Sequence, residues 1–337
     1  MTRDKNYVKL PYSPDIKGLK FRKFRGEEDY PEILRVFEKM VEADNLESAK
    51  TLEDIKREYE HLTNCNPYED MLLAEFQKEV IGYSRVYWLP LHEDRRNYIH
   101  LVNLSPEWRN KGIMEAMTRF NEERLKEIAD NHQDDIEKMY CCYCSEDQNE
   151  WSRILENFDY KIARYYFKMV NNDLDNIAEY PLPEGIEVRE VEENQYRKIW
   201  EAAKEAFKDE WNEPEWQEEW FYEFLESPNF QPELWQVAWD GDEVVGMVLN
   251  YIDEKENEKY DRKRGYTENI CVRKQWRGQG IAKALISSSL KILKDEGMEE
   301  AALGVDAENP SGALHLYKKM GFEKKKTSMT YQKLLKK

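Results

Sequence analysis

Apolar residues recur at helical spacing most clearly between residues 281 and 293. Ile281, Leu285 and Ile292 fall on one face, and Ala282, Ile286, Leu290 and Leu293 lie beside them. The preceding run, Tyr266–Val272, is typical of a strand, and Gly297 is expected to end the helix. The pattern therefore predicts a strand, a tight turn and a helix.

The turn between this strand and helix contains Arg277-Gly278-Gln279-Gly280. Backbone N–H groups at a helix N-terminus lack intrahelical partners, and the helix dipole adds partial positive charge there. The turn is therefore expected to bind an anion, most simply a phosphate or diphosphate. A Walker A loop is excluded because Gly280 is followed by Ile281 and Ala282 rather than Lys and Ser or Thr. Lys283 excludes the dinucleotide fingerprint, which needs a small residue at that position.

A second ordered pattern follows the helix. Residues 300–306 form a short apolar run that predicts a strand. Asn309, Pro310 and Ser311 are expected to open a further helix that Gly321 ends. A final strand is expected over residues 327–332.

The chain contains an internal repeat. Four segments of the first half have counterparts in the second half, in the same order and 162 to 168 residues later. The matched pairs are residues 21–24 and 188–191, 71–82 and 234–246, 108–114 and 276–282, and 157–160 and 319–322. Two copies of one fold are therefore expected. The polar, Pro- and Gly-containing stretch 171–185 is the natural linker, which predicts domains at 1–180 and 181–337.

Composition narrows the classes of partner. The 337 residues carry a net charge of −18, and 36% of them are charged. A nucleic-acid partner is not expected, because it would require a basic face. No apolar run approaches a membrane span, and the N-terminus lacks an apolar signal region, so we predict a cytoplasmic protein without a membrane partner, either a monomer or a homodimer. Cys141, Cys142 and Cys144 lack the spacing of a metal site and are expected in a buried strand, and no metal is predicted.

The segment Arg277–Ala282 has the pattern Arg-x-x-Gly-x-Ala, and it resembles the acetyl-CoA-binding signature of the GCN5-related N-acetyltransferases (GNAT). Asn309, the pair Leu316-Tyr317 and the pair Gly321-Phe322 follow in the order of the same family's core. The duplicated chain resembles tandem acetyltransferases of the mycothiol synthase type. The resemblance implies an α/β protein of two GNAT folds, each with a mostly antiparallel, centrally splayed sheet flanked by helices.

The resemblance also implies an acetyl-CoA site in the second half. Its backbone and side chains would come from Ile270, Cys271, Val272, Arg277, Gly278, Gln279, Gly280, Ile281, Ala282, Asn309, Ser311 and Tyr317. Tyr317 matches the tyrosine that protonates the departing thiolate. Glu268 is the candidate general base, on the expectation that it shares a strand face with Ile270, and Asp253 and Glu254 are rival carboxylates.

The first copy departs from this pattern. Met114 replaces Ala282, Leu155 falls where Tyr317 falls, and His100 falls where Glu268 falls, whereas Arg109 and Gly112 are kept. We therefore expect the first half to bind coenzyme A weakly or not at all, and the second half to carry the chemistry.

The predicted function is acetyl transfer from acetyl-CoA to a primary amine of a small molecule or a peptide. Two alternatives stay open, a non-catalytic CoA-binding scaffold and an aminoacyl or long-chain acyl transferase on the same fold. Substrate recognition is expected in the aromatic region 211–230, most of which should be core packing.

Overall fold

The computed structural model describes residues 7–92 and 94–336, and these residues divide into two compact units. The N-terminal unit comprises the chain up to Arg164 together with the segment from Ser328 onward, and the C-terminal unit comprises Tyr165–Thr327. Each unit is built around its own sheet, so each is described separately.

The sheet of the N-terminal unit has the strand order β1-β2-β3-β4-β5-β6-β13. Neighbouring strands are antiparallel except β5 and β6, which are parallel. The strands are β1 (Tyr7–Val8), β2 (Leu19–Arg22), β3 (Met71–Phe76), β4 (Glu79–Leu91), β5 (Arg95–Leu104), β6 (Glu137–Ser145) and β13 (Glu323–Leu334).

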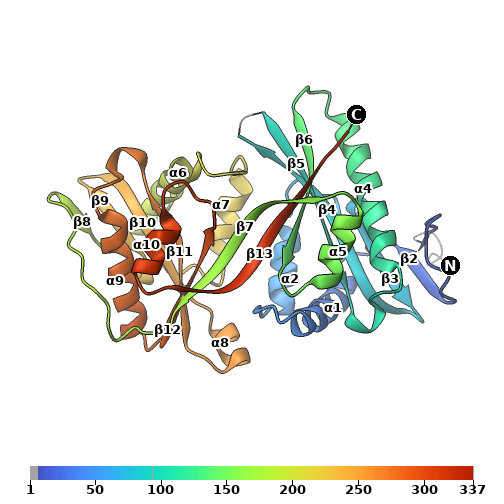
Figure 1. Cartoon of the computed structure of the whole chain (residues 1–337), viewed down its shortest axis with the longest axis horizontal. Coiled ribbons are helices and arrows are strands. Elements are labelled where there is room, and N and C mark those ends of the chain that lie inside the picture. Colours follow the sequence, from blue (N-terminus) through green and yellow to red (C-terminus); the bar gives the residue numbers. More distant parts are fainter. Residues whose placement is uncertain (1–6, 93, 337) are drawn as a thin grey trace. The chain divides into compact units, whose positions relative to one another are not determined.

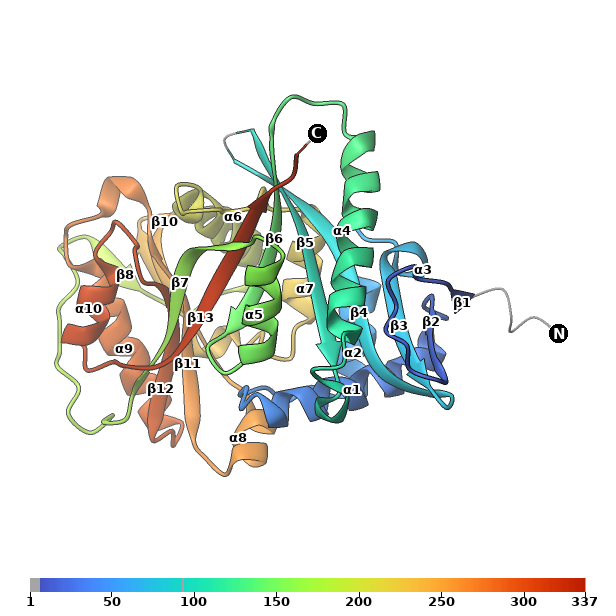
Figure 2. The ribbon, with the colours of Figure 1, turned by 45° about the vertical axis from the view of Figure 1, so that its right-hand side comes forward.

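Helices cover both faces of this sheet because each face presents an apolar cluster. Residues of α1 (Tyr30–Ala43) and α2 (Leu52–Glu60) pack on one face, and residues of α4 (Ile113–Asn131) and α5 (Asn149–Asn157) pack on the other. Figure 2 shows α4 running alongside β4 and β5. The short helix α3 (Pro67–Asp70) leads into β3.

The sheet of the C-terminal unit has the order β8-β9-β10-β11-β12-β7. Only β11 and β12 are parallel. The strands are β7 (Lys161–Asn171), β8 (Ile186–Val188), β9 (Gln236–Asp240), β10 (Glu243–Ile252), β11 (Arg264–Val272) and β12 (Glu300–Asp306). The mostly antiparallel sheet expected for each half is therefore confirmed.

Two groups of helices flank this second sheet (Figure 1). One face is covered by α9 (Ile281–Asp295) and α10 (Ala313–Lys319), and the opposite face by α6 (Tyr196–Phe207), with α7 (Glu218–Glu226) contributing aromatic packing. Helix α8 (Glu254–Tyr260) connects β10 to β11. We call the face under α9 the cofactor-side face and the face under α6 the base-side face.

The two units end differently from the single boundary expected near residue 180. Strand β7 pairs with β12, so the stretch 171–185 lies inside the C-terminal unit. Strand β13 pairs with β6, from Ser328↔Ser145 to Leu334↔Met139, and thus completes the N-terminal sheet. The strand predicted to close the second copy closes the first one instead, because backbone pairing between distant segments leaves no local signal.

Most other local predictions are confirmed. Strand β12 and the end of α9 before Gly297 agree with the sequence pattern, and Cys141, Cys142 and Cys144 lie buried in β6. One helix start is wrong, since α10 begins at Ala313, and Asn309 instead opens a turn in which its carbonyl accepts the N–H of Gly312. No helix within residues 7–92 and 94–336 is long and apolar enough to cross a bilayer.

Candidate active site

The glycine turn before α9 has the geometry of an open anion site. Gly278 and Gly280 have φ angles of 79° and 87°, in the left-handed region that side chains disfavour. An added Cβ would have no neighbour within 4 Å at either position. Gly280 caps α9 without a side-chain hydrogen bond, so the N–H groups of the first helical turn are left for another partner. Gln279 is exposed beside them, and Ile281 is buried beneath.

Arg277 fixes this turn to the neighbouring structure. Its Nε donates to the carbonyl of Val272 at 2.9 Å, and its Nη2 donates to the carbonyl of Ala206 at 3.0 Å. Ala206 lies in the last turn of α6, where unpaired carbonyls favour a cation. Both partners are backbone carbonyls, so neither brings a negative charge to the guanidinium beside the turn.

A β-bulge in β11 sets the direction of the candidate base. Asn269 has a φ of 49°, and the register with β10 shifts so that Glu268 lies opposite Leu249 and Cys271 opposite Met247. Leu249, Met247 and Cys271 belong to the cluster under α6, whereas Ile270 packs against the cluster under α9. The expectation that Glu268 and Ile270 share a face is therefore wrong, because the bulge breaks the two-residue alternation.

The central splay expected in this sheet lies beside the bulge. Pairing between β11 and β12 begins at Arg264↔Glu300 and ends at Tyr266↔Ala302. Both strands continue beyond this point, to Val272 and Asp306. The backbone of Ile270, Cys271 and Val272, the predicted pantetheine contacts, thus lines the splayed side of β11.

Glu268 has the electrostatic properties of a proton acceptor near neutral pH. Burial raises the pKa of its carboxyl from 4.5 to about 7, against the opposing effects of the Gly304 backbone N–H and of Lys168. Gly304 leaves this space open, since its added Cβ would lie 4.0 Å from Glu268 Oε1. A base with a pKa near the working pH is well matched to proton transfer.

Tyr317 lies on the other side of the splay, in α10. It is buried, and its ring contacts Phe322 with centroids 6.2 Å apart. Burial, together with the negative charge of Glu268, raises the pKa of the Tyr317 hydroxyl above its usual value. The hydroxyl therefore stays protonated at neutral pH and is available as a proton donor.

Asn309 and Ser311 form the turn that precedes α10. The Asn309 Oδ1 accepts the N–H of Ser311 at 2.8 Å, and its Nδ2 donates to Glu210 Oε2 at 3.0 Å. Burial raises the pKa of Glu210, and Asp306 adds to this effect. The amide predicted to bind pantetheine is thus held by a carboxylate from the α6–α7 loop.

The rival carboxylates have other surroundings. Asp253 caps α8, because its Oδ1 accepts the N–H of Glu256 at 2.9 Å. Glu254 is exposed in the first turn of α8. Neither sits beside the splay in the way that Glu268 does.

The corresponding turn of the N-terminal unit is occupied by the unit's own carboxylates. Arg109 makes a bidentate pair with buried Asp44, at 2.6 and 2.9 Å. The N–H of Asn110 donates to Glu150 Oε1 at 2.5 Å. Next to these groups is a cavity of about 20 Å³, room for about one water molecule. The Arg109 charge and the Asn110 N–H of this turn are therefore paired with carboxylates of the same unit.

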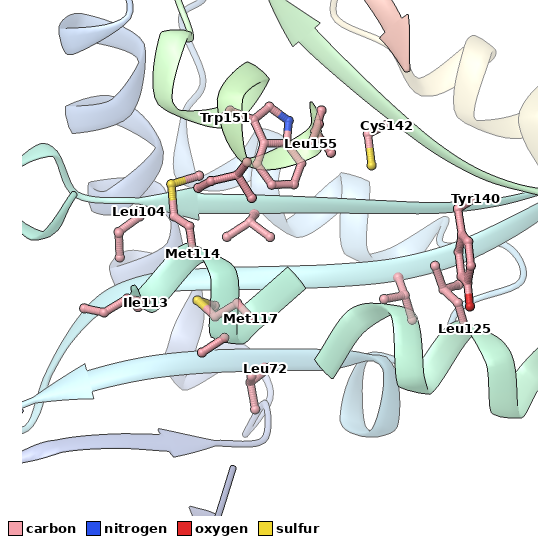
Figure 3. Packing of buried hydrophobic residues seen from close by; sticks show 14 of the residues in the cluster. Leu72, Leu104, Ile113, Met114, Met117, Leu125, Tyr140, Cys142, Trp151 and Leu155 are labelled. Carbon is pink, nitrogen blue, oxygen red and sulfur yellow. The ribbon is translucent and has the colours of Figure 1, made fainter. Parts of the chain in front are cut away.

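The three departures of the first copy are all buried. Met114 lies in the same apolar cluster as Leu104, Trp151 and Leu155 (Figure 3). His100 contacts the Tyr160 hydroxyl at 2.8 Å and the Cys142 sulfur at 3.1 Å through Nε2. Burial lowers the pKa of His100 to about 3, so it is neutral at physiological pH. This network packs the unit and leaves no accessible base at the position of Glu268.

Sequence reasoning missed three residues around the candidate site. Gly304 carried a signal, because a glycine inside a strand often marks a close approach of other groups. Glu210 and Lys168 had no such signal in the sequence. Glu210 comes from the loop after α6, and Lys168 comes from β7, which precedes the expected domain boundary.

Comparisons with known proteins agree with this architecture. The Acetyltransferase (GNAT) family model matches residues 36–153 and again residues 196–322. N-alpha-acetyltransferase 30 of Schizosaccharomyces pombe is 34% identical over 91 residues, which are 27% of this chain and 58% of that protein. Mycothiol acetyltransferase of Thermobispora bispora is 25% identical over 183 residues, which are 54% of this chain and 61% of that protein. The chain thus spans about three fifths of each of these curated relatives.

Solved structures share the duplicated fold. A GCN5-related N-acetyltransferase from Sphaerobacter thermophilus matches with a TM-score of 0.71 and 24% identity, covering 95% of this chain and 96% of that one. A tandem GNAT protein from the clavulanic acid biosynthesis pathway matches with a TM-score of 0.64 and 12% identity, covering 94% and 98%. Because the family model matches twice and covers more than half of the residues, this chain belongs to the GNAT acetyltransferase family, as a tandem of two such domains.

Proposed function

We propose that the C-terminal unit transfers an acetyl group from acetyl-CoA to a primary amine of a small molecule or a peptide. The observation that carries this proposal is the open turn at Gly278 and Gly280, which follows the splayed strand β11 that carries Glu268, with Tyr317 close enough for the charge of Glu268 to act on it. The names of the curated relatives, which are acetyltransferases, support the same reaction class.

The residues present fit coenzyme A. The N–H groups at the start of α9, the charge of Arg277 and the space beside Gly278 and Gly280 suit its diphosphate. The backbone of Cys271 and Val272 on the splayed edge suits the pantetheine arm. When bound, acetyl-CoA supplies an acetyl group activated as a thioester.

Two side chains would move the protons. Glu268 accepts a proton from the acceptor ammonium, which leaves the neutral amine that can attack. Tyr317 holds a proton on its hydroxyl oxygen for the sulfur that departs. A backbone N–H of Cys271 or Val272 stabilises negative charge on the thioester oxygen.

The role of Tyr317 gives the first prediction. Tyr317→Phe removes the hydroxyl but keeps the buried ring, so we expect kcat to fall about 10²-fold or more, the scale of acid–base catalysis, with coenzyme A affinity retained. Thiol release with acetyl-CoA and a panel of amines measures the rate, and calorimetry measures the affinity. Unchanged turnover would remove Tyr317 from the mechanism. Binding of coenzyme A without turnover of any amine by the unaltered protein would favour a non-catalytic CoA-binding module.

Arg277 gives the second prediction. Arg277→Ala removes the charge beside the turn and the two bonds that hold it, so we expect coenzyme A to bind about 1.5–3 kcal/mol more weakly. Isothermal titration of the full chain with coenzyme A measures this change. Arg273→Ala is a matched control, since Arg273 pairs with the carboxylates of Glu205 and Glu243. An equal loss in both variants would point to a general electrostatic effect.

A further inference from the structure

The base-side face of the C-terminal sheet carries side chains from three adjacent strands. Lys168 of β7 lies opposite Gly304 of β12, whose backbone N–H acts on Glu268 of β11. Gly304 has no side chain, so at this position β12 places only backbone atoms between Lys168 and Glu268. Next to this row are Val170, Ala302 and Tyr266, which form one buried cluster with Tyr251.

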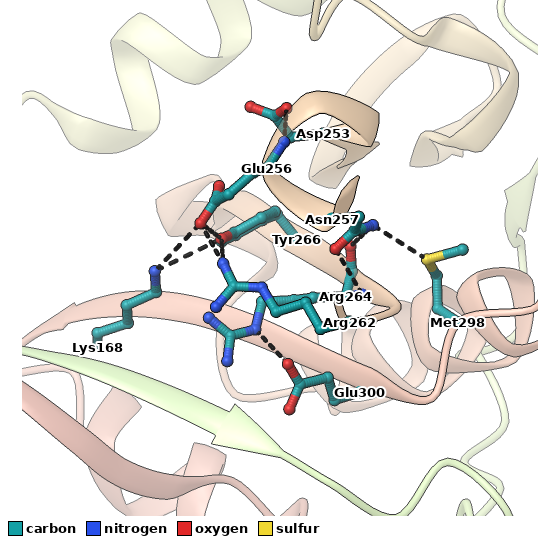
Figure 4. A network of polar contacts seen from close by, with 9 residues as sticks. All are labelled: Lys168, Asp253, Glu256, Asn257, Arg262, Arg264, Tyr266, Met298 and Glu300. Atoms are coloured by element: carbon teal, nitrogen blue, oxygen red, sulfur yellow. Dashed lines mark hydrogen bonds and ion pairs between the residues drawn. The ribbon is translucent and has the colours of Figure 1, made fainter. Parts of the chain in front are cut away.

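Lys168 places an ammonium group at one end of this face. Its Nζ lies 5.4 Å from the centroid of the Tyr266 ring, 3.4 Å from the Tyr266 hydroxyl and 3.9 Å from Glu256 Oε1 (Figure 4). The ring of Tyr266 is itself held by stacking on Tyr251, with centroids 4.9 Å apart and planes 11° apart. The lysine side chain remains about a quarter exposed, at 27%.

The charge of Glu256 is already balanced by another group. Arg262 Nη2 makes a direct ion pair with Glu256 Oε1, and the Tyr266 hydroxyl donates to the same oxygen at 2.7 Å. Lys168 contacts this oxygen at the longer distance of 3.9 Å, so it is the more distant of these two cations beside Glu256.

The opposite end of the face is acidic. Asp306 lies two residues beyond Gly304 on β12, opposite Tyr166, and it acts electrostatically on Glu210. Glu268 therefore lies between Asp306 with Glu210 at one end and Lys168, with the Arg262–Glu256 ion pair, at the other. This polarity suits a molecule that carries an ammonium and an anion a short distance apart, and it disfavours a second cationic centre near Lys168.

We propose that Lys168 determines acceptor specificity, and that the acceptor is a primary amine that also carries an anionic group, either a carboxylate or a phosphate. The ammonium group of the acceptor lies toward Glu268, and the anionic group of the acceptor binds the Lys168 side chain. This new contact replaces the 3.9 Å contact between Lys168 and Glu256. This inference rests on the proposed function, since it identifies the class of acceptor for that same site.

The experiment compares matched acceptors with acetyl-CoA and the full chain. β-Alanine is paired with β-alaninamide, and phosphoethanolamine with ethanolamine, while spermidine tests a polycation. Rates are compared per concentration of neutral amine. We expect the anionic member of at least one pair to have a kcat/KM at least tenfold higher, and Lys168→Met to reduce this ratio about tenfold or more. The pair that discriminates identifies a carboxylate or a phosphate.

Two control variants and one pH profile separate a specific role from a structural one. Lys168→Arg keeps the charge and is expected to retain most of the ratio. Lys324→Met also removes a lysine that lies over an aromatic ring, that of Phe167 at 4.9 Å, but Phe167 packs on the cofactor-side face, so the ratio should not change. Because Lys168 lowers the pKa of Glu268, Lys168→Met should also move the acidic limb of the pH profile to higher pH.

Some results would overturn the inference. These are an unchanged acceptor ratio in Lys168→Met, or a clear preference of the unaltered protein for spermidine or for the neutral amines. Calorimetry with the CoA-saturated protein distinguishes the two proposals. If β-alanine or phosphoethanolamine binds in preference to its neutral partner but no amine releases thiol, acyl transfer fails and the specificity inference stands.

Discussion

Replacing Glu268 with glutamine is expected to lower kcat/KM for the amine acceptor by about 10²- to 10⁴-fold, the contribution of a positioned general base. Glutamine has nearly the same shape, and coenzyme A affinity should therefore be retained. Because the carboxyl has a pKa of about 7, kcat/KM of the unaltered protein should fall as the pH decreases below 7. The pH profile of thiol release measures both effects, and the acidic limb should be absent in the variant.

The stability of the same variant provides a check against misfolding. Between pH 4.5 and about 7 the folded protein keeps a proton on Glu268 that the unfolded chain has lost, so this group makes stability fall as the pH rises through that range. Glu268→Gln removes this cost, and it should be at least as stable as the unaltered protein at pH 8. Urea denaturation at pH 5 and pH 8 tests this expectation.

Glu254→Gln is the matched control for the base. Glu254 is exposed in α8 and carries the same functional group, so its replacement should leave the rate unchanged. If Glu254→Gln or Asp253→Asn lost activity while Glu268→Gln kept it, the assignment of the base would be wrong.

Among the variants proposed for this protein, Arg109→Ala is expected to have the largest effect on stability. It leaves the Asp44 carboxylate buried with only Gln148, at 3.3 Å, as a remaining side-chain partner among those described. Removing one partner of such a pair costs several kcal/mol, and because Arg109 is partly exposed we expect a loss of about 3 kcal/mol in the free energy of unfolding. The melting temperature of the N-terminal unit should fall by about 6–12 °C. Denaturation followed by fluorescence and calorimetry measures this loss.

The double variant Arg109→Ala with Asp44→Asn supplies the control. It removes the unpaired charge as well, so a large part of the lost stability should return. Arg277→Ala, the counterpart in the second unit, leaves two carbonyls rather than a buried carboxylate and should change stability by less than about 1 kcal/mol. A clear loss of coenzyme A affinity in Arg109→Ala, without a loss of stability, would mean that the N-terminal unit binds the cofactor.

The parts of the fold that follow from local patterns were predictable from the sequence. Strand β12, helix α9 and the glycine turn depend on residues close together in the chain, where apolar spacing and turn chemistry act directly. The repeat also predicted two copies of one fold, because equivalent cores impose equivalent patterns.

The candidate site was predictable only where its residues lie close together in one segment of the chain. The bulge at Asn269 turned Glu268 away from the face of Ile270, and two-residue alternation gives no warning of an inserted residue. Both copies have an arginine at this position, Arg109 and Arg277, but the two side chains have different partners. The partner of Arg109 is Asp44, which lies at the end of α1, 65 residues earlier in the chain. A sequence motif therefore could not predict the interaction partners that come from distant parts of the chain.

The pairing of β13 with β6 has a consequence for biosynthesis. The N-terminal sheet is complete only when Ser328–Leu334 pairs with β6. During translation, β6 therefore lacks this partner strand while about half of the polypeptide is still being synthesised. The N-terminal unit therefore cannot complete its sheet before β13 has been synthesised, and an exposed strand edge is prone to association with other chains. Nascent chains stalled on the ribosome before residue 328 should accordingly depend on chaperones more than chains extended past residue 334.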